Sequence, residues 1–251
     1  MLSTKDLALL GQKGISEKQI EEQLDCFRKG FPFLEIMASA SVEKGISVID
    51  KEAQVGYMEA WDAYLNQNKR ILKFVPASGA ASRMFKDLYE FLDSDSNEPF
   101  SPFMEKFFAG LTSFAFYNAL DAVCLKNEKR TIPQLLSDKE YKAVVNNLLS
   151  SGGLNYGQLP KGLLQFHTYP ACVRTAMEEH LAEGAMYAKN NAAEVNIHFT
   201  VSPEHKALFE QLVAAKVPAY ENKFSVRYDI SFSVQKPSTD TLAADSENQP
   251  F

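Results

Sequence analysis

Apolar side chains recur at helical spacing through the first part of the chain, so residues 1–70 are predicted to form a helical region. Ser16 and Gln19 have the spacing of a capping box at a helix start, and Gly30 is placed to end that helix. A second helix is expected to begin near Asp50. Its apolar side would carry Val55, Met58, Trp61 and Leu65.

The next part of the chain has the pattern of a strand, a tight loop and a helix. The segment ILKFV at 71–75 is short, rich in β-forming residues and bounded by a proline. Apolar residues return at helical spacing from Ser82 onward. Residues 93–150 are predicted to form a helical insertion, in which Ser137 and Glu140 have the spacing of a further capping box.

Two alternating segments near the end of the chain predict strands. Residues 194–201 and 224–235 place apolar side chains at every second position. Between them, Ser202 is suited to cap a helix that has Pro203 at its first position. Because strands and helices alternate, we expect crossover connections and a mainly parallel sheet, which is an α/β fold of the Rossmann-like class.

Composition narrows the classes of function. The chain has 251 residues and a net charge of −6, which argues against nucleic acid as a partner because phosphate backbones are bound mainly by surplus Lys and Arg. The three cysteines are widely spaced and form no metal-ligand pair. The N-terminus lacks the apolar core of a signal peptide, and no run reaches membrane-spanning length. We therefore expect a soluble, cytoplasmic protein with no membrane partner.

The loop between Pro76 and Arg83 has the composition of an anion-binding loop. Small side chains let backbone N–H groups approach a phosphate, and the helix that follows offers its positive N-terminal end. Arg83 adds a bidentate partner for phosphate oxygens. The alternative is a tight strand-to-helix turn with Arg83 as an ordinary surface cation. The residues predicted to bind phosphate are Ala77, Ser78, Gly79, Ala80, Ala81 and Ser82.

A second loop, with Lys161 between Pro160 and Gly162, precedes a predicted helix. The order of the two loops resembles the sugar-1-phosphate nucleotidyltransferases, most nearly their uridylyltransferase branch, in which the first loop usually reads Gly-Gly-x-Gly-Thr-Arg. The stretches FVPASGAASRMFKDL and LPKGLLQFH resemble the bacterial domain-of-unknown-function family 4301, and this resemblance extends over nearly the whole chain. The predicted helix carries Val173, Met177, Leu181 and Ala185.

These resemblances imply a fold, a reaction and a set of residues. A nucleotide-diphospho-sugar transferase fold, which is a three-layer sandwich, would occupy residues 71–251. Members of family 4301 are longer, which implies an N-terminal portion whose fold is incomplete at the C-terminus. The implied reaction joins a nucleoside triphosphate to a sugar 1-phosphate and releases pyrophosphate, with Mg²⁺ as cofactor. Arg83 and Lys161 would be the catalytic cations that meet the triphosphate, and Gln235 would contact a base or sugar.

The sequence departs from the nucleotidyltransferase pattern, and these departures leave other functions open. Its first loop keeps a single glycine, Gly79. No carboxylate is identifiable as the Mg²⁺ ligand, and Asp240 and Asp245 are candidates only by position. The same fold could hold a nucleotide or another phosphorylated ligand without turnover. A structural or interaction fragment is the third alternative.

The histidines and cysteines add one further candidate. His167 follows Lys161 closely and is a candidate substrate contact. His180 lies among glutamates and His198 on the polar side of its strand, so both are interpreted as surface residues. Cys172 has no base paired with it, which argues against a nucleophilic role.

Overall fold

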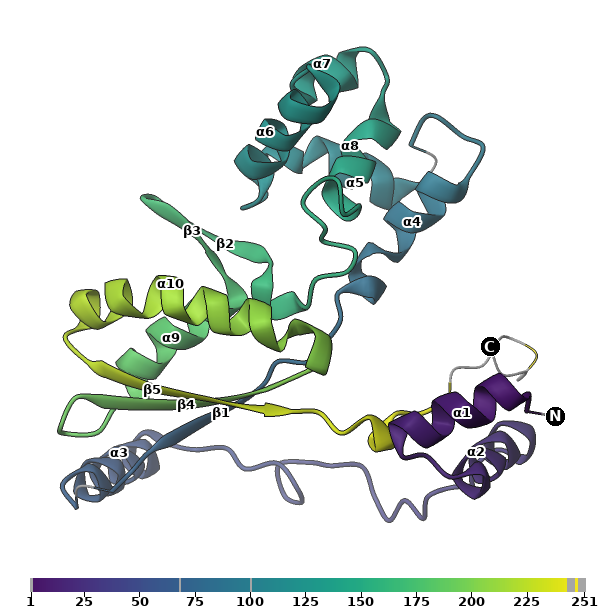
Figure 1. The fold of residues 1–251 in the computed structure, drawn as a ribbon. Helices are drawn as coiled ribbons and strands as arrows, with labels where there is room; N and C mark the ends of the chain where they lie inside the picture. Colours follow the sequence, from purple (N-terminus) through teal and green to yellow (C-terminus); the bar gives the residue numbers. More distant parts are fainter. Residues whose placement is uncertain (1, 68, 100, 243–246, 248–251) are drawn as a thin grey trace. The chain divides into compact units, whose positions relative to one another are not determined.

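The computed structural model describes residues 2–67, 69–99, 101–242 and 247 (Figure 1). The chain divides into two compact units, which are taken separately below. The first consists of Met1–Ala63 together with Gln235–Phe251, and the second is Tyr64–Val234. The C-terminal segment, which the sequence pattern assigned to the α/β domain, is thus grouped with the first helices. None of the helices in the described parts of the chain is both long enough and apolar enough to cross a membrane.

Helix caps define the start of the first unit. Helices α1 (Thr4–Lys13) and α2 (Glu17–Lys29) are followed by α3 (Lys51–Leu65), which runs across the unit boundary. At the start of α2, the Ser16 N–H donates to Gln19 Oε1 at 2.9 Å and the Gln19 N–H donates to Ser16 Oγ at 3.3 Å. Gly30 follows the helix with a φ of 73°, a conformation that favours glycine. The predicted capping box and helix end are confirmed.

The stretch between the two predicted helices, which were expected to end at Gly30 and to begin near Asp50, is not helical. Residues 31–50 contain no helix, and their regular structure is a turn in which the Ser41 N–H donates to the Lys44 carbonyl at 2.8 Å. The Phe31-Pro32 pair and Gly45, whose φ is 96°, disfavour a continuous helix here. The start of α3 is confirmed because the Ala53 N–H donates to Asp50 Oδ1. None of its described residues is buried.

The second unit is built on a three-stranded parallel sheet, which confirms the α/β prediction. Its strands are β1 (Leu72–Pro76), β4 (Glu194–Val201) and β5 (Arg227–Val234), in the order β1-β4-β5. In the register, Phe199 of β4 lies beside Val75 of β1 and Phe232 of β5. The last strand begins three residues later than predicted because the preceding helix continues to Phe224 and ends at Ser225, where φ is 50°.

Two helices cover one face of this sheet, and Figure 1 shows them on the same side. They are α9 (Ala176–Tyr187) and α10 (Lys206–Phe224), the latter entered through the 3₁₀ turn η4 (Pro203–His205). Beneath them the alternate residues of β4 are fully buried, as predicted: Val195, Ile197, Phe199 and Val201. Within the described residues of this unit, the parallel sheet is thus covered by helices α9 and α10 on one face, whereas the expected three-layer sandwich has helices on both faces.

The opposite face of the sheet is polar in its centre. His198 on β4 lies with Nδ1 2.9 Å from Ser231 Oγ and Nε2 2.8 Å from Ser233 Oγ. The Phe74 ring stacks on the imidazole with centroids 5.4 Å apart. Successive side chains of a strand point to opposite faces, so the polar residues of β4 lie on this face and contact their neighbours across the strands.

Residues 82–149 form a helical subdomain after β1, which begins earlier in the chain than the insertion predicted for residues 93–150. Its core contains Leu88, Phe91, Met104, Leu120, Leu135 and Leu148. The proposed capping box at Ser137 is wrong, because Ser137 ends a helix and the box of that helix is formed by Thr131 and Gln134. The elements are η1 (Ser82–Phe85), α4 (Lys86–Asp93), α5 (Pro102–Ala109), η2 (Leu111–Ser113), α6 (Tyr117–Glu128), α7 (Ile132–Ser137) and α8 (Tyr141–Leu149).

The segment after Lys161 forms a hairpin where a helix was predicted. A short 3₁₀ turn, η3 (Lys161–Leu163), leads into the antiparallel strands β2 (Gln165–Tyr169) and β3 (Cys172–Thr175). Aromatic and β-branched residues dominate these strands and favour this structure. The helix begins only at Ala176, where Thr175 and Glu178 form a capping box. Val173 consequently lies on a strand rather than on the helix.

Candidate functional site

The loop after β1 lies at the C-terminal edge of the sheet and leaves backbone donors free. The Ala77 N–H donates to the Thr200 carbonyl at 2.8 Å and so extends the pairing of β1 with β4. Within the described residues, the N–H groups of Ser78, Gly79 and Ala80 donate to no acceptor. Ala81 is buried in the core of the helical subdomain. Ser82, the last residue of the predicted phosphate loop, begins η1.

A second loop, distant in sequence, meets this one. The Lys161 N–H donates to the Gly79 carbonyl at 3.1 Å, and Ala80 pairs with Pro160 in an isolated antiparallel bridge. The Pro-Lys-Gly segment is therefore attached to the loop after β1 by the backbone itself. This attachment places Lys161 at the C-terminal edge of a parallel sheet, where ligands of open α/β proteins commonly bind.

The two loops enclose a small cavity of about 160 Å³, which we call the loop pocket. Its polar side is made by Gly79 and Lys161, and its apolar side by residues of the sheet and of the two covering helices. Among its described lining residues, Lys161 and His180 are the ones that carry a titratable side chain, and no carboxylate is present. The apolar residues are Val75, Met177, Phe199 and Phe209.

Gly162 allows the turn to pass close to the wall of the pocket. A Cβ atom at this position would lie 2.7 Å from Cζ and 2.8 Å from Cε1 of Phe209. The Phe209 ring is fully buried and lines the pocket, so it has little room to move. The glycine of the Pro-Lys-Gly segment is thus required by close packing.

The structure brings only one of the two predicted catalytic cations to the pocket. Lys161 lines it, is exposed, and has no ion-pair partner among the described residues. Arg83 is exposed on η1 and is not among the residues that line the pocket. His167 is exposed on β2 and also does not line it. Gln235 directly follows β5 but is grouped with the first unit, so it has no assigned place relative to the pocket.

His180 is a functional candidate that the sequence did not reveal, and its interpretation as a surface residue was incomplete. It lines the pocket from α9, one helical turn after Ala176 and Met177. Its side chain is 35% exposed. Its Nδ1 is 3.2 Å from Glu183 Oε2. The spacing of three residues between His180 and Glu183 was the available signal, because residues so spaced are neighbours on a helix.

Glu183 is in turn held by Lys73 of β1. The Lys73 ammonium donates to Glu183 Oε2 and, at 2.6 Å, to the Tyr187 hydroxyl. Only 10% of the Lys73 side chain is exposed, so the ion pair is largely shielded on that side. The hydrogen bond from Lys73 is the main cause that holds the pKa of Glu183 below its ordinary value. The carboxylate that orients His180 is therefore ionised.

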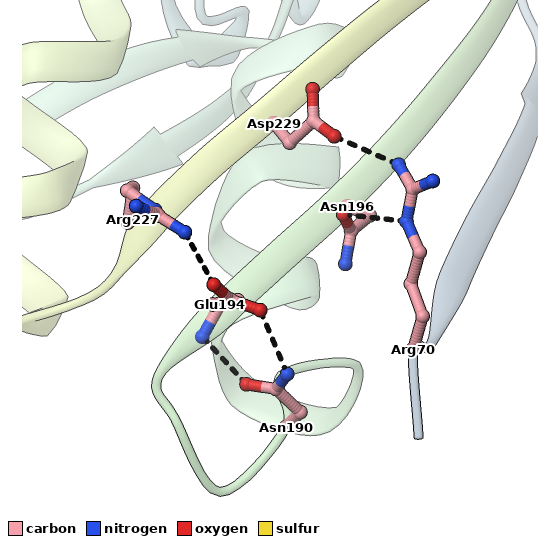
Figure 2. Close-up of a pocket in the computed structure, with 6 residues that line it drawn as sticks. All are labelled: Arg70, Asn190, Glu194, Asn196, Arg227 and Asp229. Carbon is pink, nitrogen blue, oxygen red and sulfur yellow. Dashed lines mark hydrogen bonds and ion pairs between the residues drawn. The ribbon is translucent and has the colours of Figure 1, made fainter. Parts of the chain in front are cut away.

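A larger hollow of about 410 Å³ lies at the other edge of the sheet, where the strands begin (Figure 2). Figure 2 shows that both arginines in this hollow are already paired. Arg70 donates to Asn196 Oδ1 at 2.9 Å and to Asp229 Oδ2 at 2.8 Å. Arg227 pairs with Glu194. Because each cation has its own carboxylate, this network neutralises itself and connects the starts of the strands. Of these two hollows, the loop pocket is the one that holds a cation, Lys161, without an ion-pair partner among the described residues.

The described residues contain no group of three His, Cys, Asp or Glu side chains that could hold a metal ion. Asp240, one of the two positions considered for Mg²⁺, forms an ion pair with Lys13 at 3.1 Å within the first unit. Asp245, the other, lies outside the described residues.

Comparison with known proteins gives one match. A family model described as "Domain of unknown function (DUF4301)" matches residues 3–251, which is nearly the whole chain. No curated protein and no solved structure matches it.

Proposed function

Since the chain belongs to the DUF4301 family, whose description assigns no reaction, we propose a function from the site itself. The proposed function is the binding of a phosphorylated small molecule in the loop pocket. The observation that carries this proposal is the shared position of Lys161 and the free N–H groups beside Gly79. Backbone N–H groups and an ammonium are the donors that phosphate oxygens accept most readily. A carboxylate, which would repel an anion, is absent from the described lining.

The size of the pocket narrows the proposal. Sites for drug-sized ligands occupy about 300–1,000 Å³, whereas the loop pocket has about 160 Å³. It can therefore enclose a phosphate with a small adjoining group, and the remainder of a larger ligand would extend along the exposed side. The apolar wall formed by Met177, Phe199 and Phe209 suits the non-ionic part of such a molecule.

Nucleotidyl transfer from a nucleoside triphosphate to a sugar phosphate is the finer form of this proposal. It is supported by the order of the two loops in the sequence. The position of Lys161 in the pocket lining supports this form, whereas Arg83 lies on η1 outside the described pocket lining. In this form, Lys161 would neutralise charge on the transferring phosphate.

Calorimetric titration tests the binding proposal. The protein is titrated with inorganic phosphate, glucose 1-phosphate and UTP, with and without MgCl₂. Lys161→Ala should weaken phosphate binding about tenfold or more, since hydrogen bonds to charged groups contribute roughly 1.5–3 kcal/mol. Lys189→Ala is the matched control, because Lys189 is also an exposed lysine without an ion-pair partner in the described structure and does not line the pocket.

Each outcome decides between the forms of the proposal. Binding that is lost in Lys161→Ala and kept in Lys189→Ala supports a phosphate site. Pyrophosphate release from UTP and glucose 1-phosphate would support nucleotidyl transfer. If none of the three compounds binds, or if both variants bind as the unchanged protein does, the loop pocket is not a phosphate site.

A further inference from the structure

We propose that His180 is a general base in the loop pocket and that the protein hydrolyses a phosphate ester bound there. The inference rests on the proposed function, because the phosphate must first be held by Lys161 and the loop amides. It adds a reaction and a catalytic residue to that binding site. The carrying observation is that a histidine oriented by a carboxylate lines a pocket suited to phosphate.

The contact with Glu183 selects one tautomer of His180. An ionised carboxylate accepts hydrogen bonds and donates none, so the His180 Nδ1, 3.2 Å from Glu183 Oε2, carries a proton. In the neutral ring Nε2 then has a free lone pair. Nε2 has no hydrogen-bond partner among the described residues. It is the atom available to take a proton from a molecule in the pocket.

The carboxylate is itself fixed in place. Glu183 Oε2 accepts from the Lys73 ammonium and from the Tyr187 hydroxyl, the latter at 3.1 Å, and the Lys73 ammonium lies 4.7 Å from the centre of the Tyr187 ring. A purely structural ion pair between β1 and α9 would need Lys73 and Glu183 alone. The additional contact to a pocket histidine supplies two parts of the arrangement found in hydrolytic sites, a base and the acid that orients it, and water would be the nucleophile.

The other groups around His180 are two lysines and two aromatic rings. Lys161 contributes a positive charge from the loop, and Lys73 contributes another behind Glu183. The sheet and α10 present the Phe199 and Phe209 rings to the same space, with the Phe199 centroid 6.3 Å from that of the imidazole. A lysine ammonium keeps its proton near neutral pH. Histidine is therefore the side chain that can accept a proton there.

The proposed hydrolysis consumes no reagent other than water. A water oxygen forms a bond to the phosphorus while His180 Nε2 takes one of its protons. The bond between the phosphorus and the ester oxygen breaks, and its electron pair stays with that oxygen. The ester oxygen takes a proton from solvent, giving an alcohol and inorganic phosphate, and the imidazolium, stabilised by Glu183, returns its proton to solvent. Lys161 and the loop N–H groups offset the charge on the other phosphoryl oxygens.

Hydrolysis of p-nitrophenyl phosphate by the full chain tests this step. His180→Asn should lower the rate of hydrolysis about 100-fold or more, which is the range attributed to general base catalysis. The Kd for inorganic phosphate should stay within about twofold of its original value, because binding depends on Lys161 and the loop N–H groups. His198→Asn is the control, since His198 is partly buried and hydrogen-bonded on the opposite face of the sheet. Thermal unfolding of both variants shows whether each is folded, and His180→Gln replaces His180→Asn if it is not.

Glu183→Gln separates positioning from simple support of the fold. With a neutral amide, the imidazolium loses its stabilising partner, so the rate falls and the rise of the rate with pH begins at a lower pH. A purely structural role would leave the shape of the pH profile unchanged. An unchanged profile would refute the positioning role of Glu183.

The possible failures are distinguishable. Phosphate binding that depends on Lys161, together with no hydrolysis by the unchanged protein, would overturn the His180 proposal and leave the binding proposal standing. Hydrolysis that survives in His180→Asn and His180→Gln would also overturn it. If phosphate does not bind at all, the proposed function fails, and this inference fails with it.

Discussion

The backbone N–H of Lys161 donates to the carbonyl oxygen of Gly79 at 3.1 Å, so two loops distant in sequence form one wall of a pocket. The bond uses main-chain atoms and leaves the lysine side chain free to meet a ligand. It also leaves the Gly79 N–H unpaired within the described residues. This arrangement joins a strand-end loop to a cation that has no acidic partner in the described part of the chain, a combination that favours the binding of an anion.

Gly162→Ala should destabilise the protein by about 1–3 kcal/mol, because the added methyl group overlaps the buried Phe209 ring. Since Phe209 lines the loop pocket, phosphate affinity should fall as well. Urea unfolding and phosphate titration measure the two effects. Gly79→Ala is the stability control, since a Cβ there would meet no heavy atom within 4 Å. Equal unfolding midpoints for the two variants would contradict the packing argument.

Leu148→Ala should lower the free energy of unfolding by about 2–5 kcal/mol, because it leaves a cavity in a fully buried core. Leu148 lies on α8 at the centre of the helical subdomain. Leu125→Ala on α6 is the control, since half of the Leu125 side chain is exposed. Equilibrium unfolding in urea measures both. A loss below about 1 kcal/mol for Leu148→Ala would show that this core is loosely packed.

Cys124 should resist alkylation at pH 8 in the folded protein, whereas Cys172 should react. Burial raises the pKa of the Cys124 thiol from its ordinary value of 9.0 to about 11, and the thiolate is the reactive form. Cys172 is exposed on the hairpin. Peptide mass spectrometry after iodoacetamide treatment identifies the labelled residues. Labelling of Cys124 as fast as Cys172 would contradict the burial of the α6 helix.

The same shift predicts a loss of stability in alkaline solution. Because the folded pKa is raised, the neutral thiol contributes stability that is fully present below pH 9.0 and is lost as the pH rises towards about 11. Cys124→Ala should therefore lose less stability than the unchanged protein between these pH values. Urea unfolding at each pH supplies the comparison, and parallel curves would refute the prediction.

Glu183 predicts the opposite dependence at acid pH. The pKa of Glu183 is lowered, and the largest cause is the hydrogen bond from Lys73. The carboxylate therefore contributes stability that is fully present above its ordinary pKa of 4.5. This contribution is lost as the pH falls through the lowered pKa of the folded state. Glu183→Gln should therefore be less sensitive to acid. Because the side chain is partly exposed, solvent screening should keep the difference within about 1 kcal/mol. Acid titrations of unfolding followed by circular dichroism measure it, and identical titrations would contradict the ion pair.

The amino-acid sequence predicted the elements whose signals are local. The alternation of Val195, Ile197, Phe199 and Val201 predicted β4 with its limits, and the capping box at Ser16 predicted the start of α2. The small residues from Ala77 to Ala81 predicted a tight loop after β1. Such signals succeed because alternation and cap chemistry depend on neighbouring residues only.

The hairpin shows where a local pattern stops being sufficient. Residues 165–175 contain apolar side chains that fit either a strand or the continuation of a helix, and periodicity does not separate these for short runs. The choice was made by contacts of the strands with each other and with α9, together with the cap at Thr175. The prediction that Ser137 begins a helix failed for a related reason, since Thr131 supplied a competing cap upstream.

The sequence by itself therefore predicted an α/β chain with a parallel sheet, a helical insertion and two loops with the composition expected of phosphate-binding loops. Only the tertiary structure decided which side chains share a pocket: it brought Lys161 to Gly79, left Arg83 on an exposed turn, and turned His180 inward beside Glu183. The physical reason is that helix and strand periodicity arises from neighbours along the chain. A binding site is made by packing between elements that are far apart in sequence, and a one-dimensional pattern does not contain those distances.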